Sequence, residues 1–320
     1  MLLFGCKDTK IIPFMQIICV IYLFFIPLQR KSPRVSTFNI RFPKQMIGIF
    51  DSGYGGLTIL NHIRQLLPEY DYLYLGDNAR APYGTRSFDV IYEYTLQAVN
   101  YLHEQGCNLI ILACNTASAK ALRSIQQRNI NPDELRVLGV IRPTVEIIPS
   151  RTRSKHIGVL ATPGTVASES YVIELQKQDP ELVVTQQACP MWVPLIESGE
   201  HLHEGADYFV EKYLTELLER DPLIDTIILG CTHYPLLQEK IEAFLAQQSI
   251  SQQAVSVIAQ GEIVAESLED YLERHQDIAE RAKVGSTGKC QFLTTEAASK
   301  FSESASLFLD EEILAKHIEL

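Results

Sequence analysis

Residues 46–56 read Met-Ile-Gly-Ile-Phe-Asp-Ser-Gly-Tyr-Gly-Gly, an apolar run that ends in an acid, a serine and closely spaced glycines. A run rich in branched apolar residues and bounded by turn residues is typical of a buried strand. Similar runs recur at 71–75, 109–112, 137–140, 157–160, 182–185, 226–229 and 255–259. Amphipathic stretches lie between them, for example 87–105, 117–127 and 208–219. This alternation predicts an α/β fold with parallel sheets covered by helices on both faces.

Two stretches of the chain each occur twice. Residues 47–53 resemble 157–164, and residues 108–116 resemble 225–233, in the same order and nearly in register. Two matches in one order favour an internal duplication, although any two α/β strands share some composition. Each half would then be an α/β unit in which one strand ends in a cysteine followed by two polar residues.

The composition is that of a folded globular protein. The 320 residues are 46% hydrophobic and 21% charged, which suggests about two domains. A formal net charge of −11 argues against a broad nucleic-acid interface, which needs a concentrated basic face. The seven cysteines include no close CxxC pair, so neither a disulfide framework nor a zinc ribbon is indicated, and free thiols favour a reducing compartment.

The first 45 residues differ from the rest. Residues 11–28 are almost entirely apolar, with basic residues on both sides. They allow three interpretations: a signal anchor, a signal peptide, or a stretch upstream of a misassigned start. Because Met46 directly precedes the first predicted strand, we predict that residues 1–45 are a dispensable extension. Membrane contact is expected only if residues 11–28 are a real anchor.

Polar residues follow three of the predicted strands: Asp51-Ser52, Cys114-Asn115-Thr116 and Cys231-Thr232-His233. Ligands of open α/β sheets bind beyond the carboxyl ends of the strands. If the two halves face each other, Cys114 and Cys231 lie on opposite sides of one ligand. A thiolate is a competent base and a thiol a competent acid, so this arrangement suits inversion of a carbon centre by proton transfer.

The neighbours of the two cysteines fit this chemistry. Asn115 and Thr116 would begin a helix, whose free N–H groups favour a carboxylate, and Thr232 and His233 would do the same in the second half. Asp51 and His233 are titratable groups placed to tune the two sulfurs or relay protons to them. The glycines after the first strand allow the backbone to approach a ligand closely.

Other interpretations of these residues are weaker. A cysteine after a buried strand is often a small core residue. The Gly-rich loop lacks the lysine and spacing of a nucleotide-binding loop, and Cys231 and His233 lack the partners of a hydrolase or a metal site. We assign a structural role to the remaining cysteines, and core or surface packing to four aromatic residues. These are Cys6, Cys19, Cys107, Cys189 and Cys290, and Trp192, Tyr70, Tyr72 and Tyr74.

Six motifs together resemble those of the glutamate racemases, cofactor-independent enzymes that supply D-glutamate for bacterial cell walls. They lie within residues 49–57, 76–84, 113–117, 161–166, 193–197 and 229–236. The resemblance spans about residues 46–310 and implies two pseudo-symmetric domains, a site between them, a homodimer and a cytoplasmic location. We predict a first domain of residues 46–137 plus 253–310 and a second of residues 138–252.

The resemblance also implies roles for single residues. Cys114 matches the base that acts on D-glutamate, and Cys231 the base that acts on L-glutamate. Glu197 matches an acid that supports the second cysteine, and Thr162 a contact to a carboxylate. The positions that match substrate-contacting residues are Asp51, Ser52, Tyr83, Gly84, Asn115, Thr116, Thr232 and His233.

The sequence thus predicts a racemase that interconverts L- and D-glutamate without cofactor or metal. One alternative is a related racemase acting on aspartate or another amino acid. Another is a glutamate-binding protein built on an inactive racemase scaffold. A membrane-tethered enzyme is the third, if residues 11–28 are translated and inserted.

Overall fold

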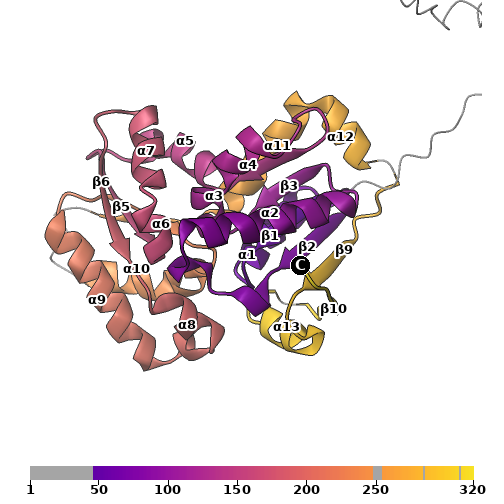
Figure 1. Ribbon diagram of the computed structural model, residues 1–320. Helices are drawn as coiled ribbons and strands as arrows, with labels where there is room; N and C mark the ends of the chain where they lie inside the picture. Colours follow the sequence, from indigo (N-terminus) through magenta and orange to yellow (C-terminus); the bar gives the residue numbers. More distant parts are fainter. Residues whose placement is uncertain (1–45, 248–253, 284, 310) are drawn as a thin grey trace, which may run out of the picture. The chain divides into compact units, whose positions relative to one another are not determined.

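The computed structural model describes residues 46–247, 254–283, 285–309 and 311–320, which form two parallel sheets flanked by helices (Figure 1). In this part of the chain the first sheet has the strand order β10-β9-β2-β1-β3-β4, and the second has the order β6-β5-β7-β8. Every strand pair is parallel. The predicted fold class is confirmed. The predictions for residues 1–45 lie outside the described residues.

The elements follow one another in regular alternation. The strands are β1 (Ile47–Asp51), β2 (Tyr72–Gly76), β3 (Leu109–Leu112), β4 (Arg136–Gly139), β5 (His156–Ala161), β6 (Val183–Ala188), β7 (Thr226–Gly230), β8 (Ser256–Ile258), β9 (Cys290–Thr294) and β10 (Ala315–His317). The helices are α1 (Gly56–Leu66), α2 (Phe88–Glu104), α3 (Asn115–Lys120), α4 (Leu122–Arg128), α5 (Ile141–Arg151), α6 (Pro163–Ala167), α7 (Ser170–Gln178), α8 (Trp192–Glu197), α9 (Glu204–Arg220), α10 (Gln238–Gln247), α11 (Gly261–Arg274), α12 (Gln276–Lys283) and α13 (Ala298–Ala305).

Alternate residues of the first sheet face two separate layers of core. Ile47 and Ile49 of β1 belong to a cluster with apolar residues of α1 and α11, whereas Phe50 belongs to a second cluster with residues of α2. Successive side chains of a strand point to opposite faces, so a strand covered on both faces must be apolar throughout. This explains why the motif that opens the domain lacks the polar alternation of a half-exposed strand.

The second sheet is covered in the same way. Leu160 of β5 lies in a cluster with residues of α8 and α9, whereas Val159 packs with residues of α5 and α7. Trp192 lies fully buried at the start of α8, with its ring against Tyr234. Trp192 and the three tyrosines of 70–74 are core residues, as predicted.

The internal repeat of the sequence is a repeat of topology. β1 lies between β2 and β3, and β5 lies between β6 and β7, each strand parallel to its neighbours. Ile47 pairs with Leu109, and its counterpart Ile157 pairs with Thr226. The register is therefore the same in both sheets, and Cys114 and Cys231 follow equivalent strands at equivalent distances. β9 and β10 extend the first sheet and, within the described residues, have no counterpart in the second.

Some details differ from the sequence predictions. The helix predicted at 117–127 is divided at Ala121 into α3 and α4. β8 lies in a segment predicted for the first domain but pairs with β7 of the second sheet, and β10 lies beyond residue 310 but joins the first sheet. The predicted domain bounds stay a prediction. Strand pairing, however, places β8 in the second sheet and β10 in the first.

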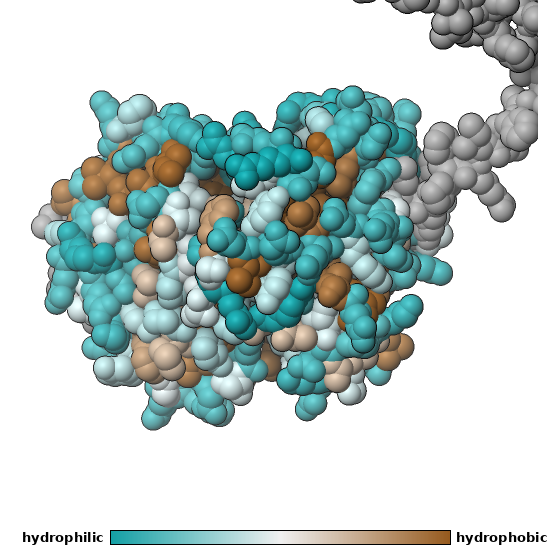
Figure 2. Space-filling view, viewed as in Figure 1, coloured by the Kyte–Doolittle hydropathy of each residue, from teal (hydrophilic) through white to brown (hydrophobic). Residues whose placement is uncertain are grey.

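The surface in Figure 2 is mostly hydrophilic, with apolar side chains in small separate groups. Among the described residues, no helix combines the length and the apolar character that crossing a bilayer requires.

Candidate active site

A cavity of about 100 Å³ lies beyond the carboxyl ends of both sheets. Cys114, after β3, and Cys231, after β7, both line it, and each is about 95% buried, with 5% and 6% of its surface exposed. Drug-sized ligands occupy pockets of roughly 300–1,000 Å³, so this cavity suits a much smaller molecule. All predicted site residues except Asp51 line it: Ser52, Tyr83, Gly84, Cys114, Asn115, Thr116, Thr162, Glu197, Cys231, Thr232 and His233.

Cys114 has neutral hydrogen-bond partners and a buried acid nearby. Its Sγ lies 3.3 Å from Ser52 Oγ, and Ala117 N donates to it over 3.5 Å at the start of α3. Burial and the charge of Asp51 raise the pKa of the Cys114 thiol to about 12, although the two hydrogen bonds work in the opposite direction. Cys114 is therefore held as a thiol at neutral pH.

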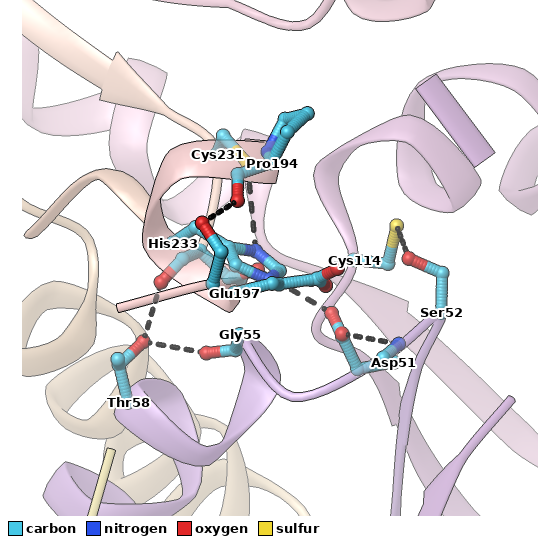
Figure 3. A network of polar contacts seen from close by, with 12 residues as sticks. Asp51, Ser52, Gly55, Thr58, Cys114, Pro194, Glu197, Cys231 and His233 are labelled. Atoms are coloured by element: carbon cyan, nitrogen blue, oxygen red, sulfur yellow. Dashed lines mark hydrogen bonds and ion pairs between the residues drawn. The ribbon is translucent and has the colours of Figure 1, made fainter. Parts of the chain in front are cut away.

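Cys231 faces a cation instead. Its Sγ lies 3.9 Å from His233 Nδ1, and His233 Nε2 lies 3.0 Å from Glu197 Oε1, as Figure 3 shows. Burial by itself would lower the pKa of His233, but the contacts with Cys231 and Glu197 raise it to about 10. At neutral pH a protonated imidazole therefore lies between the sulfur and the carboxylate.

Asp51 lies behind the cavity wall. It is fully buried, accepts a 2.8 Å hydrogen bond from Gly53 N, and accepts a longer one of 3.4 Å from Thr232 Oγ1. Burial raises the pKa of this carboxyl, although the nearby His233 opposes the shift. Asp51 thus links the loop after β1 to the loop after β7 without lining the cavity. Its predicted contact with substrate stays a prediction.

Glycine is required in the loop after β1 because the loop after β7 packs directly against it. A Cβ at Gly55 would lie 2.3 Å from both His233 Nδ1 and Thr232 Oγ1. Thr58 Oγ1 reinforces the contact by donating to Thr232 O over 3.1 Å. Gly55 thus makes a close approach to the other half of the protein, whereas the predicted approach of these glycines to a ligand stays a prediction.

Three threonine hydroxyls join the two halves on the side of Cys114. Thr116 Oγ1 lies 2.9 Å from Thr162 Oγ1 and 3.2 Å from Thr165 Oγ1, and Thr162 and Thr165 are 3.1 Å apart. Gly84 packs against the same cluster, since a Cβ there would lie 2.8 Å from Thr162 Cβ. A hydroxyl both donates and accepts, so this cluster can reorient toward a carboxylate.

Tyr83 lines the cavity, although its hydroxyl is bound to an acid that does not line it. The hydroxyl donates to Asp77 Oδ2, and the same oxygen accepts from Arg80 Nε over 2.6 Å. Thr295 Oγ1 donates to the other oxygen of Asp77 over 2.8 Å. The hydroxyl proton of Tyr83 is therefore bound to Asp77 and is not free to be donated to a ligand.

Some polar residues at or near the cavity were not predicted as site residues from the sequence. Cys189, assigned a structural role, also lines the cavity. Thr165 bonds the two predicted threonines, and Gln260 contacts Asn115. Thr165 lies within a recognised motif but was given no role of its own, and nothing in the sequence near Gln260 indicates a site. In the described part of the chain, no three His, Cys, Asp or Glu side chains are grouped so as to hold a metal ion.

Comparison with known proteins agrees with this geometry. The family model for Asp/Glu/Hydantoin racemases matches residues 57–268. This chain belongs to that family. A glutamate racemase from a Ruegeria species is 41% identical over 277 residues, covering 83% of this chain and 97% of the relative. The glutamate racemase of Aquifex aeolicus is 37% identical and covers 84% of this chain and 96% of its own length.

Solved racemases share the fold over nearly their whole length. A glutamate racemase isoform from Bacillus anthracis has a TM-score of 0.76 at 32% identity, covering 86% of this chain and 98% of that protein. The glutamate racemase of Francisella tularensis, solved in complex with D-glutamate, has a TM-score of 0.75 at 30% identity with the same coverage. The family resemblance predicted from the motifs is thereby confirmed.

Proposed function

We propose that this chain is a glutamate racemase that inverts the α-carbon by proton transfer between two thiols. The observation that carries the proposal is that Cys114 and Cys231, from equivalent loops of two sheets, line one small cavity. The relatives that match most of the chain carry the name glutamate racemase, which supports glutamate as the substrate.

In the direction from L- to D-glutamate, the Cys231 thiolate removes the α-proton and becomes a thiol. The electron pair of the broken C–H bond stays on the substrate as a carbanion. The Cys114 thiol then donates its proton to the opposite face, which leaves D-glutamate and a Cys114 thiolate. The reverse direction uses the same steps in the opposite order. Because each step transfers only a proton, the substrate is neither oxidised nor reduced.

The surroundings of the two sulfurs support these roles. The protonated imidazole of His233 stabilises negative charge on Cys231, and Glu197 stabilises the imidazolium. Cys114 carries its proton at rest, because burial and Asp51 disfavour its thiolate. One sulfur is thus suited to take a proton while the other is suited to give one.

The lining offers neutral hydrogen-bonding groups for the substrate carboxylates. We assign this role to the hydroxyls of Ser52, Thr116 and Thr162, the amide of Asn115, and the Thr232 loop. Supply of D-glutamate for cell-wall synthesis, a homodimer and a cytoplasmic location follow from the family resemblance and stay predictions.

The decisive experiment incubates the purified chain with L-glutamate in deuterated water. We expect optical rotation to disappear, and deuterium to enter the α-carbon of the D-glutamate formed. L-aspartate serves as the comparison substrate. Exchange or racemisation confined to aspartate would contradict glutamate as the substrate, and binding of glutamate without any exchange would contradict catalysis.

A further inference from the structure

Asn115, the residue after the first cysteine, belongs to a closed ring of buried hydrogen bonds. Asn115 Nδ2 donates to Gln260 Oε1 over 2.7 Å, Gln260 Nε2 lies 3.0 Å from the Tyr171 hydroxyl, and that hydroxyl donates to Asn115 Oδ1 over 2.7 Å. At most 2% of the surface of each of the three residues is exposed. None of the motifs shared with racemases includes Gln260.

A backbone carbonyl outside the ring fixes its direction. Gln260 Nε2 donates to Val140 O over 3.2 Å, and a carbonyl can only accept. The Gln260 amide nitrogen therefore faces Val140 and Tyr171, and its oxygen faces Asn115. Asn115 must then present an N–H to Gln260, and its oxygen must accept from Tyr171. Thr144 Oγ1, 2.9 Å from Gln260 Nε2, supports the same orientation.

This orientation determines what Asn115 offers the cavity that it lines. Its oxygen is bound to Tyr171, and one of its two N–H groups is bound to Gln260. Among the described residues, Gln260 is the one acceptor that the Asn115 amide nitrogen meets, which leaves its second N–H for a ligand. An anionic oxygen is the natural partner of such a donor, and a flipped amide would weaken a carboxylate contact.

The ring also joins the two halves of the protein. Asn115 begins α3 after a strand of the first sheet, whereas Tyr171 lies on α7 and Gln260 follows β8 of the second sheet. Gln260 immediately precedes α11, and a Cβ at the next residue, Gly261, would lie 2.1 Å from the His62 ring on α1. The close packing of α1 against α11 leaves the Gln260 backbone little freedom to move.

We propose that Gln260 is a positioning residue of the racemase: it holds the Asn115 amide with one N–H directed at a substrate carboxylate. The inference rests on the proposed function, because it requires an amino-acid substrate in the cavity. Gln260 acts through Asn115 and does not itself contact the substrate.

The test is a double-mutant cycle of Gln260→Met and Asn115→Ala, with KM and kcat measured in both directions. Gln260→Met keeps the length of the side chain but removes the hydrogen bond that Gln260 Oε1 accepts from Asn115. We expect KM for glutamate to rise about tenfold in the single variant, as for loss of one oriented hydrogen bond to a charged group. We expect no further rise when Gln260→Met is added to Asn115→Ala, because residues that act through one contact are not additive.

Two further variants separate positioning from general stability. Tyr171→Phe removes the hydroxyl that orients Asn115, and should raise KM in the same way even if Gln260→Met fails to fold. Gln187→Met removes another buried glutamine whose Nε2 donates to a backbone oxygen, Ala188 O at 3.0 Å, outside the cavity. It should leave KM unchanged.

Additive effects in the cycle, or an unchanged KM in both Gln260→Met and Tyr171→Phe, would overturn the proposal. These outcomes are read against a wild-type chain that racemises glutamate. A wild-type chain without racemisation or exchange would instead overturn the proposed function.

Discussion

The loops after β3 and β7 occupy equivalent places in the two sheets but surround their cysteines with different groups. Cys114 has a serine hydroxyl and a backbone N–H beside it, with buried Asp51 nearby. Cys231 has the His233 imidazole, which is itself paired with Glu197. The repeat in the fold thus supplies two sulfurs, and the unequal surroundings hold the proton on Cys114 and place a protonated imidazole beside Cys231.

The largest effect should follow removal of either sulfur. We expect Cys114→Ala and Cys231→Ala each to lower kcat/KM by about 10³-fold, because each variant lacks the acid or the base of one face. Racemisation measured by circular dichroism in both directions checks this. Cys107→Ala is the matched control, since Cys107 is also buried but does not line the cavity.

Full racemisation in both directions by either alanine variant would contradict the assignment of two thiols. Loss of activity in Cys107→Ala together with loss of native circular dichroism would instead indicate an effect on folding.

The next effect should come from the imidazole that distinguishes the two loops. We expect His233→Asn to lower kcat/KM by about 10²-fold, as for loss of one preorganised charged group. The fall should be equal in the two directions, because the equilibrium constant between enantiomers is one. Since the pKa of His233 is raised to about 10, wild-type kcat/KM should decline as the pH rises through about 10, and His233→Asn should lack this decline.

Ser52→Ala is the corresponding change at the other cysteine. The hydrogen bond between its hydroxyl and Cys114 is neutral and contributes about 1 kcal/mol, so kcat/KM should fall only about fivefold. The decline near pH 10 should persist in this variant. A loss as large as that of His233→Asn would contradict the difference between the two loops.

The smallest effect should appear in stability. The pKa of His233 in the folded state lies above 6.5, the value of an unperturbed imidazole, so the folded protein binds more protons between these values. The contribution of His233 is therefore fully present below pH 6.5 and is lost as the pH rises through about 10. Urea unfolding of wild type between pH 6.5 and 9 should show a falling free energy of unfolding, with a shallower fall in His233→Asn.

Cys114 also lowers the free energy of unfolding as the pH rises, but only above pH 9, the ordinary pKa of a thiol. Its pKa in the folded protein is raised to about 12. The comparison is therefore made below pH 9, and Ser52→Ala should retain the wild-type slope. Equal slopes in wild type and His233→Asn would contradict the raised pKa of the imidazole.

Much of this arrangement was visible in the sequence. The apolar runs at 47–50 and 157–160 predicted strands because both of their faces are buried, and such strands carry no polar alternation. The position of each cysteine directly after a strand predicted its place at the carboxyl end of a sheet. The repeat then predicted that the carboxyl ends of two equivalent strands would each carry a cysteine sulfur.

Contacts between distant segments were not predictable in this way. Glu197 was assigned only through family resemblance, and its contact with His233 depends on how α8 packs beside the β7 loop. Asp51 lies within a recognised motif, but its side chain turns behind the cavity wall to Thr232. Gln260 had no recognisable motif, and its role became visible only in the ring with Asn115 and Tyr171.

The sequence by itself determined two parallel sheets, the equivalence of their strands, and the two cysteines at the strand ends. These follow from local apolar patterning and from a repeated order of residues, both of which lie within short stretches of chain. Only the tertiary structure decided which charged and polar groups face each sulfur. Those contacts join residues far apart in the chain, and burial between the two sheets sets the protonation of Cys114 and His233.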